Sequence, residues 1–387
     1  MIPYGRQEIC RDDIRSVTRT LNSDWLTQGP NVQKFEDLVA EKVGSKFAIA
    51  CNSATSALHL ACKSLNLKKG DIVWTSPNSF VASANAAIYC DAKVDFVDID
   101  PRTYNLSIEK LEQKLIYSKK NNCLPKIIIP VHFAGQSCDM KSIYKLSKKY
   151  KFKIIEDASH AIGGSYENQK VGSCKYSSIT VFSFHPVKII TTAEGGIATT
   201  NNRKIAERLF RDRSHGITRD KKSFRKVYKD EIWNYQQVDL GFNYRMNDIQ
   251  AALGISQLQK LQKFINKRHQ IASYYDSELS NLGICLPYQN INTNSSYHLY
   301  PIRVSKKKGG INQRKLFDYL RGNNIGVNLH YIPIYRHPYF RELGFKKGYC
   351  EEAENHFKEV ISLPIYSGLR KREQKFVIDS IKAMYKK

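Results

Sequence analysis

Short runs of apolar residues recur along the first half of the chain, each about as long as one buried strand. They lie at 46–51, 71–76, 93–98, 126–133, 151–157, 178–184 and 196–200. Segments that read as helices separate several of them, at 53–65, at 79–89 and near 140–150. Buried strands that alternate with helices are typical of a mostly parallel sheet with helices on both faces. The pattern therefore predicts an α/β fold.

The C-terminal third has a different pattern. Asn247 and Gln250 have the spacing of a capping box, at the start of a long helix that we expect over 249–279. A strand at 297–304, a helix at 313–320 and an amphipathic helix at 371–385 follow. We expect a large domain at 1–262 and a smaller C-terminal α/β domain at 263–387.

The residues directly after the apolar runs are the candidates for chemistry, because ligands bind at the carboxyl ends of strands in such sheets. Thr55 belongs to a group of small residues that opens a helix, where free N–H groups suit a phosphate or simply an N-cap. Asp157 ends another run, where it could serve a ligand or only cap the next helix. Ser183 and Lys188 follow a third run.

Lys188 lies in the largely uncharged stretch SFHPVKIITTAEGG at 183–196. A lysine that loses solvation has a lowered pKa, and its neutral amine is a nucleophile that can form a Schiff base. Pyridoxal phosphate needs such a lysine for its aldehyde, an acidic partner for its pyridine nitrogen, and a cradle for its phosphate. Three separate strand ends supply these parts, so the sequence predicts pyridoxal 5'-phosphate as the cofactor.

Composition fits a soluble globular protein of 387 residues, with 42% hydrophobic and 25% charged residues. The apolar runs are far shorter than the roughly 20 residues that span a bilayer, and there is no secretory signal. The nine cysteines form no CxxC pair and the ten histidines no HExxH motif. We therefore expect a cytoplasmic protein with reduced thiols, no membrane partner and no metal.

The net charge of +25 is unusual and would also suit a protein that binds nucleic acid. However, the lysines are spread in short groups without interleaved aromatic residues, which favours a solvated basic surface. We expect no nucleic-acid partner. The absence of GxGxxG and GxxxxGK[ST] argues against a dehydrogenase, an epimerase or a P-loop enzyme.

Seven segments carry a more specific signal. They are SDWLTQGP at 23–30, NSATSALHL at 52–60, SPNSFVASANA at 76–86, EDASHAIG at 156–163, FSFHPVKIITTAEGG at 182–196, RSHGI at 213–217 and LGFNYRMNDIQAALGISQL at 240–258. In these segments and their order, the chain resembles the DegT-type sugar-nucleotide aminotransferases, a branch of the fold-type I pyridoxal phosphate enzymes. The resemblance implies a large domain with a mostly parallel seven-stranded sheet between helices, and a smaller C-terminal domain.

The resemblance also implies roles for matched residues. Lys188 would bind the cofactor aldehyde and carry the proton between the substrate and the cofactor, and Asp157 would pair with the pyridine nitrogen. His160 would lie near the phenolic oxygen and Phe80 would stack on the ring. The positions matched to phosphate contacts are Ala54, Thr55 and Ser183, with Asn243 reaching across from a second subunit. Those matched to contacts with the nucleotide sugar are Tyr4, Asp24, Trp25, Leu26, Thr27, Asn328, Leu329, His330 and Tyr331.

Structural alternatives exist for three of these residues. Phe80 could be a core residue, His160 a hydrogen-bonded structural histidine, and Trp25 a packing residue.

The predicted activity is transfer of an amino group from L-glutamate to C4 of a UDP-linked 4-keto-6-deoxy-N-acetylhexosamine, by a homodimer with shared active sites. Within the family, the likeness is greatest to the branch that serves pseudaminic acid biosynthesis. Another nucleotide 4-keto-6-deoxysugar is the alternative substrate. A non-catalytic regulator that binds pyridoxal phosphate and DNA is the alternative of a different class. A sugar 3-dehydratase is disfavoured, because those relatives replace with histidine the lysine that this chain keeps as Lys188.

Overall fold

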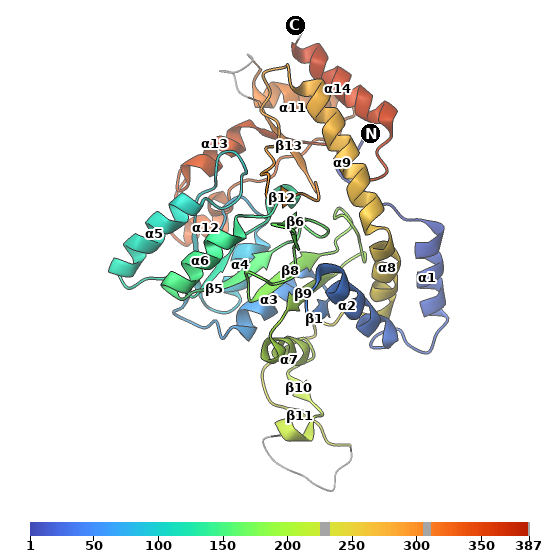
Figure 1. The fold of residues 1–387 in the computed structure, drawn as a ribbon, viewed down its shortest axis with the longest axis vertical. Helices are drawn as coiled ribbons and strands as arrows, with labels where there is room; N and C mark the ends of the chain where they lie inside the picture. The colour runs from blue at the N-terminus through green and yellow to red at the C-terminus, as the bar shows by residue number, and fades with distance from the viewer. Residues whose placement is uncertain (225–232, 305–310, 386–387) are drawn as a thin grey trace.

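The computed structural model describes residues 1–224, 233–304 and 311–385. Its main feature is a seven-stranded sheet with the strand order β1-β9-β8-β5-β4-β2-β3 (Figure 1). Neighbouring strands run parallel except around β9, which is antiparallel to both β1 and β8. The predicted mostly parallel sheet is therefore confirmed. Its strands are β1 (Phe47–Cys51), β2 (Ile72–Thr75), β3 (Lys93–Phe96), β4 (Ile127–Ile129), β5 (Lys153–Asp157), β8 (Ile179–Ser183) and β9 (Gly196–Thr200).

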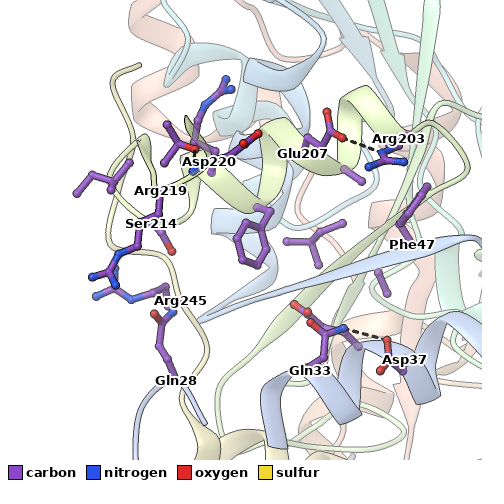
Figure 2. Close-up of a pocket in the computed structure, with 18 of the residues that line it drawn as sticks. Gln28, Gln33, Asp37, Phe47, Arg203, Glu207, Ser214, Arg219, Asp220 and Arg245 are labelled. Atoms are coloured by element: carbon purple, nitrogen blue, oxygen red, sulfur yellow. Dashed lines mark hydrogen bonds and ion pairs between the residues drawn. The ribbon is translucent and has the colours of Figure 1, made fainter. Parts of the chain in front are cut away.

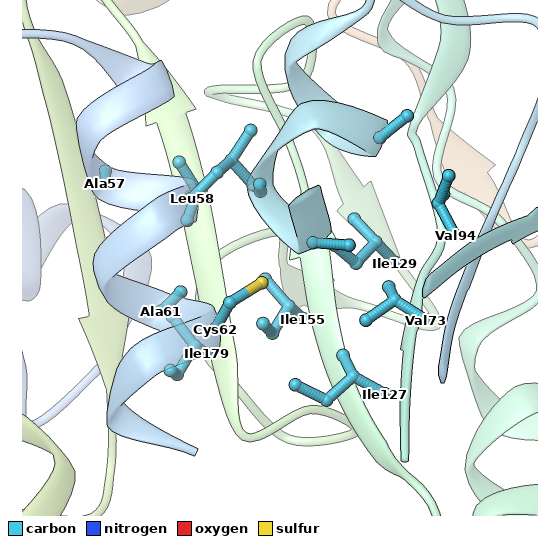
Figure 3. Close-up of a cluster of buried hydrophobic side chains, with 14 of the residues drawn as sticks. Ala57, Leu58, Ala61, Cys62, Val73, Val94, Ile127, Ile129, Ile155 and Ile179 are labelled. Carbon is cyan, nitrogen blue, oxygen red and sulfur yellow. The ribbon is translucent and has the colours of Figure 1, made fainter. Parts of the chain in front are cut away.

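Alternate residues of the central strands pack into separate cores on the two faces of the sheet. Ile127, Ile129 and Ile155 lie under helix α3 (Ala54–Ser64), as Figure 3 shows. Ile128 and Ile154 point the other way and pack with side chains from α5 (Ile108–Lys120) and α6 (Met140–Tyr150). Because successive strand residues face opposite sides, uninterrupted apolar runs are what a sheet covered on both faces requires.

A further apolar cluster lies in the C-terminal third, around an antiparallel pair of strands. The pair is β13 (Tyr300–Arg303) and β14 (Val360–Leu363), and α9 (Leu261–Leu279), α11 (Gln313–Gly322) and α14 (Lys371–Tyr385) contribute residues to the cluster. The domain boundary at 262 stays a prediction.

The single long helix expected over 249–279 is wrong. The structure has α8 (Asp248–Gln259) and α9, separated at Lys260, whose backbone angles are φ −96° and ψ −1°. The Lys260 ammonium binds Asp13 Oδ1 of α1 (Arg11–Leu21) at 2.6 Å, so its backbone closes α8 while its side chain joins α1. The capping box formed by Asn247 and Gln250 is confirmed.

An arm leaves the body of the protein after α7 (Arg203–Asp212) and extends away from it (Figure 1). It contains the short antiparallel pair β10 (Ile217–Thr218) and β11 (Gln236–Gln237). The remaining helices and strands are α2 (Pro30–Val43), α4 (Ala82–Ile88), β6 (Ser165–Tyr166), β7 (Gln169–Lys170), β12 (Thr293–Asn294), α12 (Pro338–Glu342) and α13 (Glu351–Glu359). Within the described ranges, no helix has the length and apolar character needed to cross a membrane.

Candidate active site

Asp157 lies at the carboxyl end of β5 and is 4% exposed. Its Oδ2 accepts a hydrogen bond from the Ser83 hydroxyl at 2.6 Å. Its Oδ1 accepts from the Ser159 hydroxyl at 2.6 Å and from the Ser159 backbone N–H at 3.1 Å. Turns rather than a helix follow β5, so the alternative that Asp157 only caps a helix is wrong. Three donors on a buried carboxylate fix its orientation.

Lys188 lies in the turn that follows β8 and is only partly exposed. Two backbone hydrogen bonds of Phe184 close this turn. The Phe184 N–H donates to the Gly195 carbonyl at 2.9 Å, and the Phe184 carbonyl accepts from the Thr192 N–H at 3.0 Å. Burial lowers the pKa of the Lys188 amine to about 8, and the negative charge of Asp157 opposes this shift. The sequence-based argument for a desolvated lysine is thus matched by its surroundings.

His160 lies beside this pair. Its Nε2 is 3.1 Å from the Tyr331 hydroxyl, and its Nδ1 is buried with no partner among the described residues. Burial, followed by the charges of Lys188 and His330, lowers the pKa of His160 well below its ordinary value, so the ring is neutral. The alternative of a purely structural, hydrogen-bonded histidine accounts for Nε2 but leaves Nδ1 without a role.

A cradle for a phosphate is built where α3, β8 and β9 meet. Ser53 caps α3 by accepting from the Ser56 N–H at 3.1 Å, which leaves the N–H groups of Ala54 and Thr55 in the open first turn. Ser183 pairs with Gly196 across the sheet. A Cβ on Gly196 would lie 2.4 Å from the Ala54 nitrogen, so only glycine lets β9 approach the helix this closely.

Phe80 precedes α4 and its side chain is 62% exposed, so the alternative that it is a core residue is wrong. The Phe80 carbonyl accepts a hydrogen bond from the N–H of Ser83, the residue that binds Asp157. Phe80 therefore lies next to the group formed by Asp157, Ser83 and Ser159, and its side chain is accessible to a ligand.

The segment Asn328 to Tyr331 reaches the same cluster from the C-terminal third. Tyr331 binds His160, and its N–H donates to Asn78 Oδ1 at 3.2 Å. The centre of the Tyr4 ring lies 5.4 Å from that of the His330 ring. Burial raises the pKa of Tyr4, and a hydrogen bond with Asn328 partly opposes this shift. The Leu329 N–H donates to Asn328 Oδ1 at 2.8 Å, which keeps this short segment in place.

Among the described residues, two groups of predicted residues form no hydrogen bond or ring contact with Asp157, His160 or Tyr331. Asn243 is exposed and touches Asn52 only through its backbone carbonyl, at 3.4 Å. The segment Asp24, Trp25, Leu26 and Thr27 connects α1 and α2, and the Leu26 carbonyl accepts from the Asp248 N–H at 3.1 Å. Trp25 is 57% exposed and lies against Gly29, so it packs only in part within this chain.

A cavity of 1160 Å³ lies beside this second group, and Lys188 does not line it. It follows the outer edge of β1 between α2 and α7, with Gln33 and Asp37 on one wall and Arg203 and Glu207 on the other (Figure 2). We call it the edge cavity. Its size does not make it the catalytic centre, because the perturbed amine and its carboxylate partner lie elsewhere.

Sequence reasoning missed three residues of the Lys188 cluster. Ser159 could have been found, since an aspartate side chain often accepts a hydrogen bond from the backbone N–H two residues on. Ser83 could not, because only the fold brings α4 against β5. His298, whose buried ring lies 4.3 Å from that of His160, also comes from a distant part of the chain.

The residues fit pyridoxal phosphate. The unpaired Nδ1 of His160, the open first turn of α3 and the exposed ring of Phe80 each leave a group free for a ligand beside a desolvated lysine. The described part of the chain has no group of three or more histidine, cysteine, aspartate or glutamate residues suited to a metal ion.

Comparison with known proteins gives a consistent result. Residues 7–382 match the DegT/DnrJ/EryC1/StrS aminotransferase family. The UDP-4-amino-4,6-dideoxy-N-acetyl-beta-L-altrosamine transaminase of Campylobacter jejuni is 38% identical over 388 residues, which cover 100% of this chain and 98% of that protein. Helicobacter pylori PseC, an aminotransferase involved in the biosynthesis of pseudoaminic acid, has a TM-score of 0.88 and 32% identity, covering 100% and 99% of the two chains. The PLP-form of a putative sugar aminotransferase from Streptococcus pneumoniae also has a TM-score of 0.88, with 28% identity and coverage of 100% and 98%.

Proposed function

Because the chain belongs to the DegT/DnrJ/EryC1/StrS aminotransferase family, we propose that it carries an amino group from L-glutamate to C4 of a UDP-linked 4-keto-6-deoxy-N-acetylhexosamine, with pyridoxal phosphate as cofactor. The observation that carries the proposal is the desolvated amine of Lys188 within electrostatic reach of Asp157 at the carboxyl edge of the sheet. The name of the Campylobacter relative supports the choice of sugar and a role in pseudaminic acid biosynthesis.

Lys188 acts as nucleophile and base. At its pKa of about 8, about one amine in ten is neutral at pH 7, against roughly one in 3,000 at the ordinary value of 10.5. Bound here, pyridoxal phosphate supplies the electron sink that stabilises a carbanion next to the amino group. Lys188 takes the proton from the carbon that carries the amino group of the donor, and returns a proton to C4 of the sugar.

Asp157 would pair with the protonated pyridine nitrogen of the cofactor, because Ser83 and Ser159 hold the orientation of its carboxylate. Burial raises the pKa of Tyr331 far above its ordinary value, so its phenol stays protonated and donates to His160 Nε2. Neutral His160 then carries its proton on Nδ1, where it can donate to the phenolic oxygen of the cofactor.

The phosphate of the cofactor binds at the N-terminus of α3, with the Ala54 and Thr55 N–H groups and the Ser183 hydroxyl as donors. Phe80 stacks on the ring. Tyr4 and the segment Asn328 to Tyr331 contact the nucleotide sugar. Their packing against the His160 cluster supports this assignment.

The protein works as a homodimer with shared active sites. Apolar side chains stay exposed on the arm and near the edge cavity, including Trp233 at 74%, Leu240 at 68% and Trp25 at 57%. Exposed apolar surface of this kind is typical of a protein interface. A second copy that covers this face would bring Asn243 and the segment Asp24 to Thr27 against the partner's phosphate and sugar.

Product identification tests the proposed activity. The enzyme is incubated with L-glutamate and a panel of UDP- and dTDP-linked 4-ketosugars, and the products are identified by mass spectrometry and NMR. We expect 2-oxoglutarate and a UDP-linked sugar aminated at C4, and no product with Lys188→Ala. Amination only of a dTDP-linked sugar would move the assignment to the alternative substrate. Salt-sensitive retention of DNA without turnover on any sugar would favour the regulator instead.

A further inference from the structure

A second polar cavity, of 640 Å³, lies at the opposite edge of the sheet from Asp157. We call it the lysine cleft. The C-terminal part of α6, the start of β5, the loop before β8 and the start of α7 line it. Strand β5 begins in the cleft at Lys153 and ends at Asp157, so about 13 Å of extended backbone separates the cleft from the catalytic edge. The cleft is thus a different place from the cofactor site.

The charged residues that line the lysine cleft are all positive. Lys148, Lys151, Lys153 and Lys175 line it, and no aspartate or glutamate does. Among the described residues, none of these four lysines forms an ion pair with a carboxylate, whereas Lys141 and Lys149 near the same helix pair with Glu167 and Glu112. Glu167 lies near enough for Lys175 to help lower its pKa, but its oxygens are bonded to Lys141 and to the Tyr176 hydroxyl.

Two of the four ammonium groups lie over aromatic rings of the same cleft. Lys148 Nζ lies 4.8 Å from the ring centre of Tyr144, and Lys175 Nζ lies 5.4 Å from that of Tyr176. The two rings pack edge to face, with centres 5.8 Å apart. A cation over a ring face is attracted to it, so both of these exposed lysines have a ring contact inside the cleft. Because the Tyr144 and Tyr176 rings already contact these lysines and each other, a ligand would bind to the ammonium groups and would not stack on the rings.

The N-terminus of α7 adds donors to the same cavity. Asn202 and Asn201 line the cleft, and Asn202 Oδ1 caps α7 by accepting from the Ile205 N–H at 3.2 Å. The helix has ten residues, and the positive end of its dipole faces the cleft. Ser178 supplies a hydroxyl group nearby, whereas the Ser177 hydroxyl donates to Glu156 Oε1 at 2.5 Å. Ammonium groups, a hydroxyl and a helix N-terminus together form the donor set that proteins use for phosphate groups.

We propose that the lysine cleft binds a small diphosphate-bearing anion, at a site separate from the cofactor and from the nucleotide sugar. Two linked phosphates match four ammonium groups better than one phosphate does, and the cavity is larger than a single phosphate needs. The ligand is held by charge and hydrogen bonds, so free pyrophosphate and the diphosphate of a nucleotide are the same chemistry for this site.

Calorimetric titration of the holoenzyme with pyrophosphate tests the proposal, at constant ionic strength because exposed charges are screened by salt. The test variant is Lys148→Gln/Lys175→Gln. The matched control is Lys119→Gln/Lys145→Gln, which removes two exposed lysines from α5 and α6 that do not line the cleft. Equal melting temperatures confirm that both variants fold.

We expect pyrophosphate affinity to fall about tenfold or more in the test variant and to stay within about twofold in the control. Orthophosphate should bind more weakly than pyrophosphate to the wild type, and UDP should lose one binding event in the test variant only. The proposal is overturned by equal pyrophosphate affinity in the two variants, by no binding to the wild type, or by orthophosphate binding as tightly as pyrophosphate.

Discussion

The carboxyl edge of the sheet and the outer face beside β1 differ in how far one chain completes them. At the carboxyl edge, Asp157 receives all three of its hydrogen bonds from its own chain, and Lys188 is desolvated by its own chain. On the outer face, Asn243 and Trp25 are exposed beside a cavity of 1160 Å³. The comparison indicates that one subunit orders the cluster around Asp157, and the exposed outer face supports the proposal that a second subunit covers it.

The largest effect is expected from Lys188→Ala. Loss of the amine removes the nucleophile and the base together, so turnover should fall by about 10⁴-fold or more, measured as 2-oxoglutarate formed from glutamate. In the wild type, borohydride should fix the cofactor on the peptide that contains Lys188, and mass spectrometry of the digest identifies that peptide. Lys145→Ala, an exposed change on α6, should leave both results unchanged. Cofactor fixed on another lysine would remove Lys188 from the mechanism.

Asp157→Asn should have the next largest effect. An amide cannot stabilise a protonated pyridine nitrogen, so turnover should fall by about 10³-fold, while the protein still binds the cofactor and stays yellow. The matched control is Asp318→Asn on α11, where an exposed carboxylate accepts from Arg314. Near-normal turnover in Asp157→Asn would mean that the carboxylate has only a structural task.

Gly196→Ala should act on cofactor binding rather than on chemistry. The new Cβ would lie 2.4 Å from the backbone nitrogen of Ala54, and backbone cannot move aside as a side chain can. We expect the Kd for pyridoxal phosphate, from spectroscopic titration of the apoenzyme, to rise about tenfold or more. Gly322→Ala is the control, because a Cβ there meets nothing within 4 Å. Equal affinity in both variants would place the phosphate elsewhere.

The smallest effect is expected from Tyr331→Phe, which removes only the hydroxyl that faces His160 Nε2. The loss of one hydrogen bond is worth about 1 kcal/mol, so kcat/KM should fall about fivefold. The absorbance of the bound cofactor should titrate at a different pH, because His160 loses the contact that sets its tautomer. An unchanged titration would show that the Tyr331 hydroxyl does not act through His160.

The sequence predicted the sheet well because strands buried on both faces leave uninterrupted apolar runs. The run at 196–200 became β9 with the same bounds. The sequence did not predict the break between α8 and α9 at Lys260, because apolar residues continue at helical spacing through that point. At the break, the Lys260 side chain binds Asp13, which lies 247 residues earlier in the chain.

Some residues of the candidate site could likewise be predicted from the sequence, and others could not. Lys188 and Asp157 were predictable, because strand ends and uncharged surroundings are local features of the sequence. The contact between Ser83 and Asp157 was not, because it joins residues 74 positions apart. The exposure of Phe80 and Trp25 was also invisible, since an aromatic residue in a sequence reads equally well as core or as surface.

The comparison between the two regions is tested most directly by mixing Lys188→Ala with Asn243→Ala under conditions that exchange subunits, once each variant alone is found to be impaired and still dimeric. If Asn243 serves the partner's site, one site of each heterodimer collects both lesions and the other is intact. Equal mixing should then restore about a quarter of wild-type sites. Mixing Lys188→Ala with Asp157→Asn is the control and should restore none, because both residues belong to one cluster. No recovery in the first mixture, with heterodimers confirmed, would mean that Asn243 serves the site of its own chain, next to Asn52.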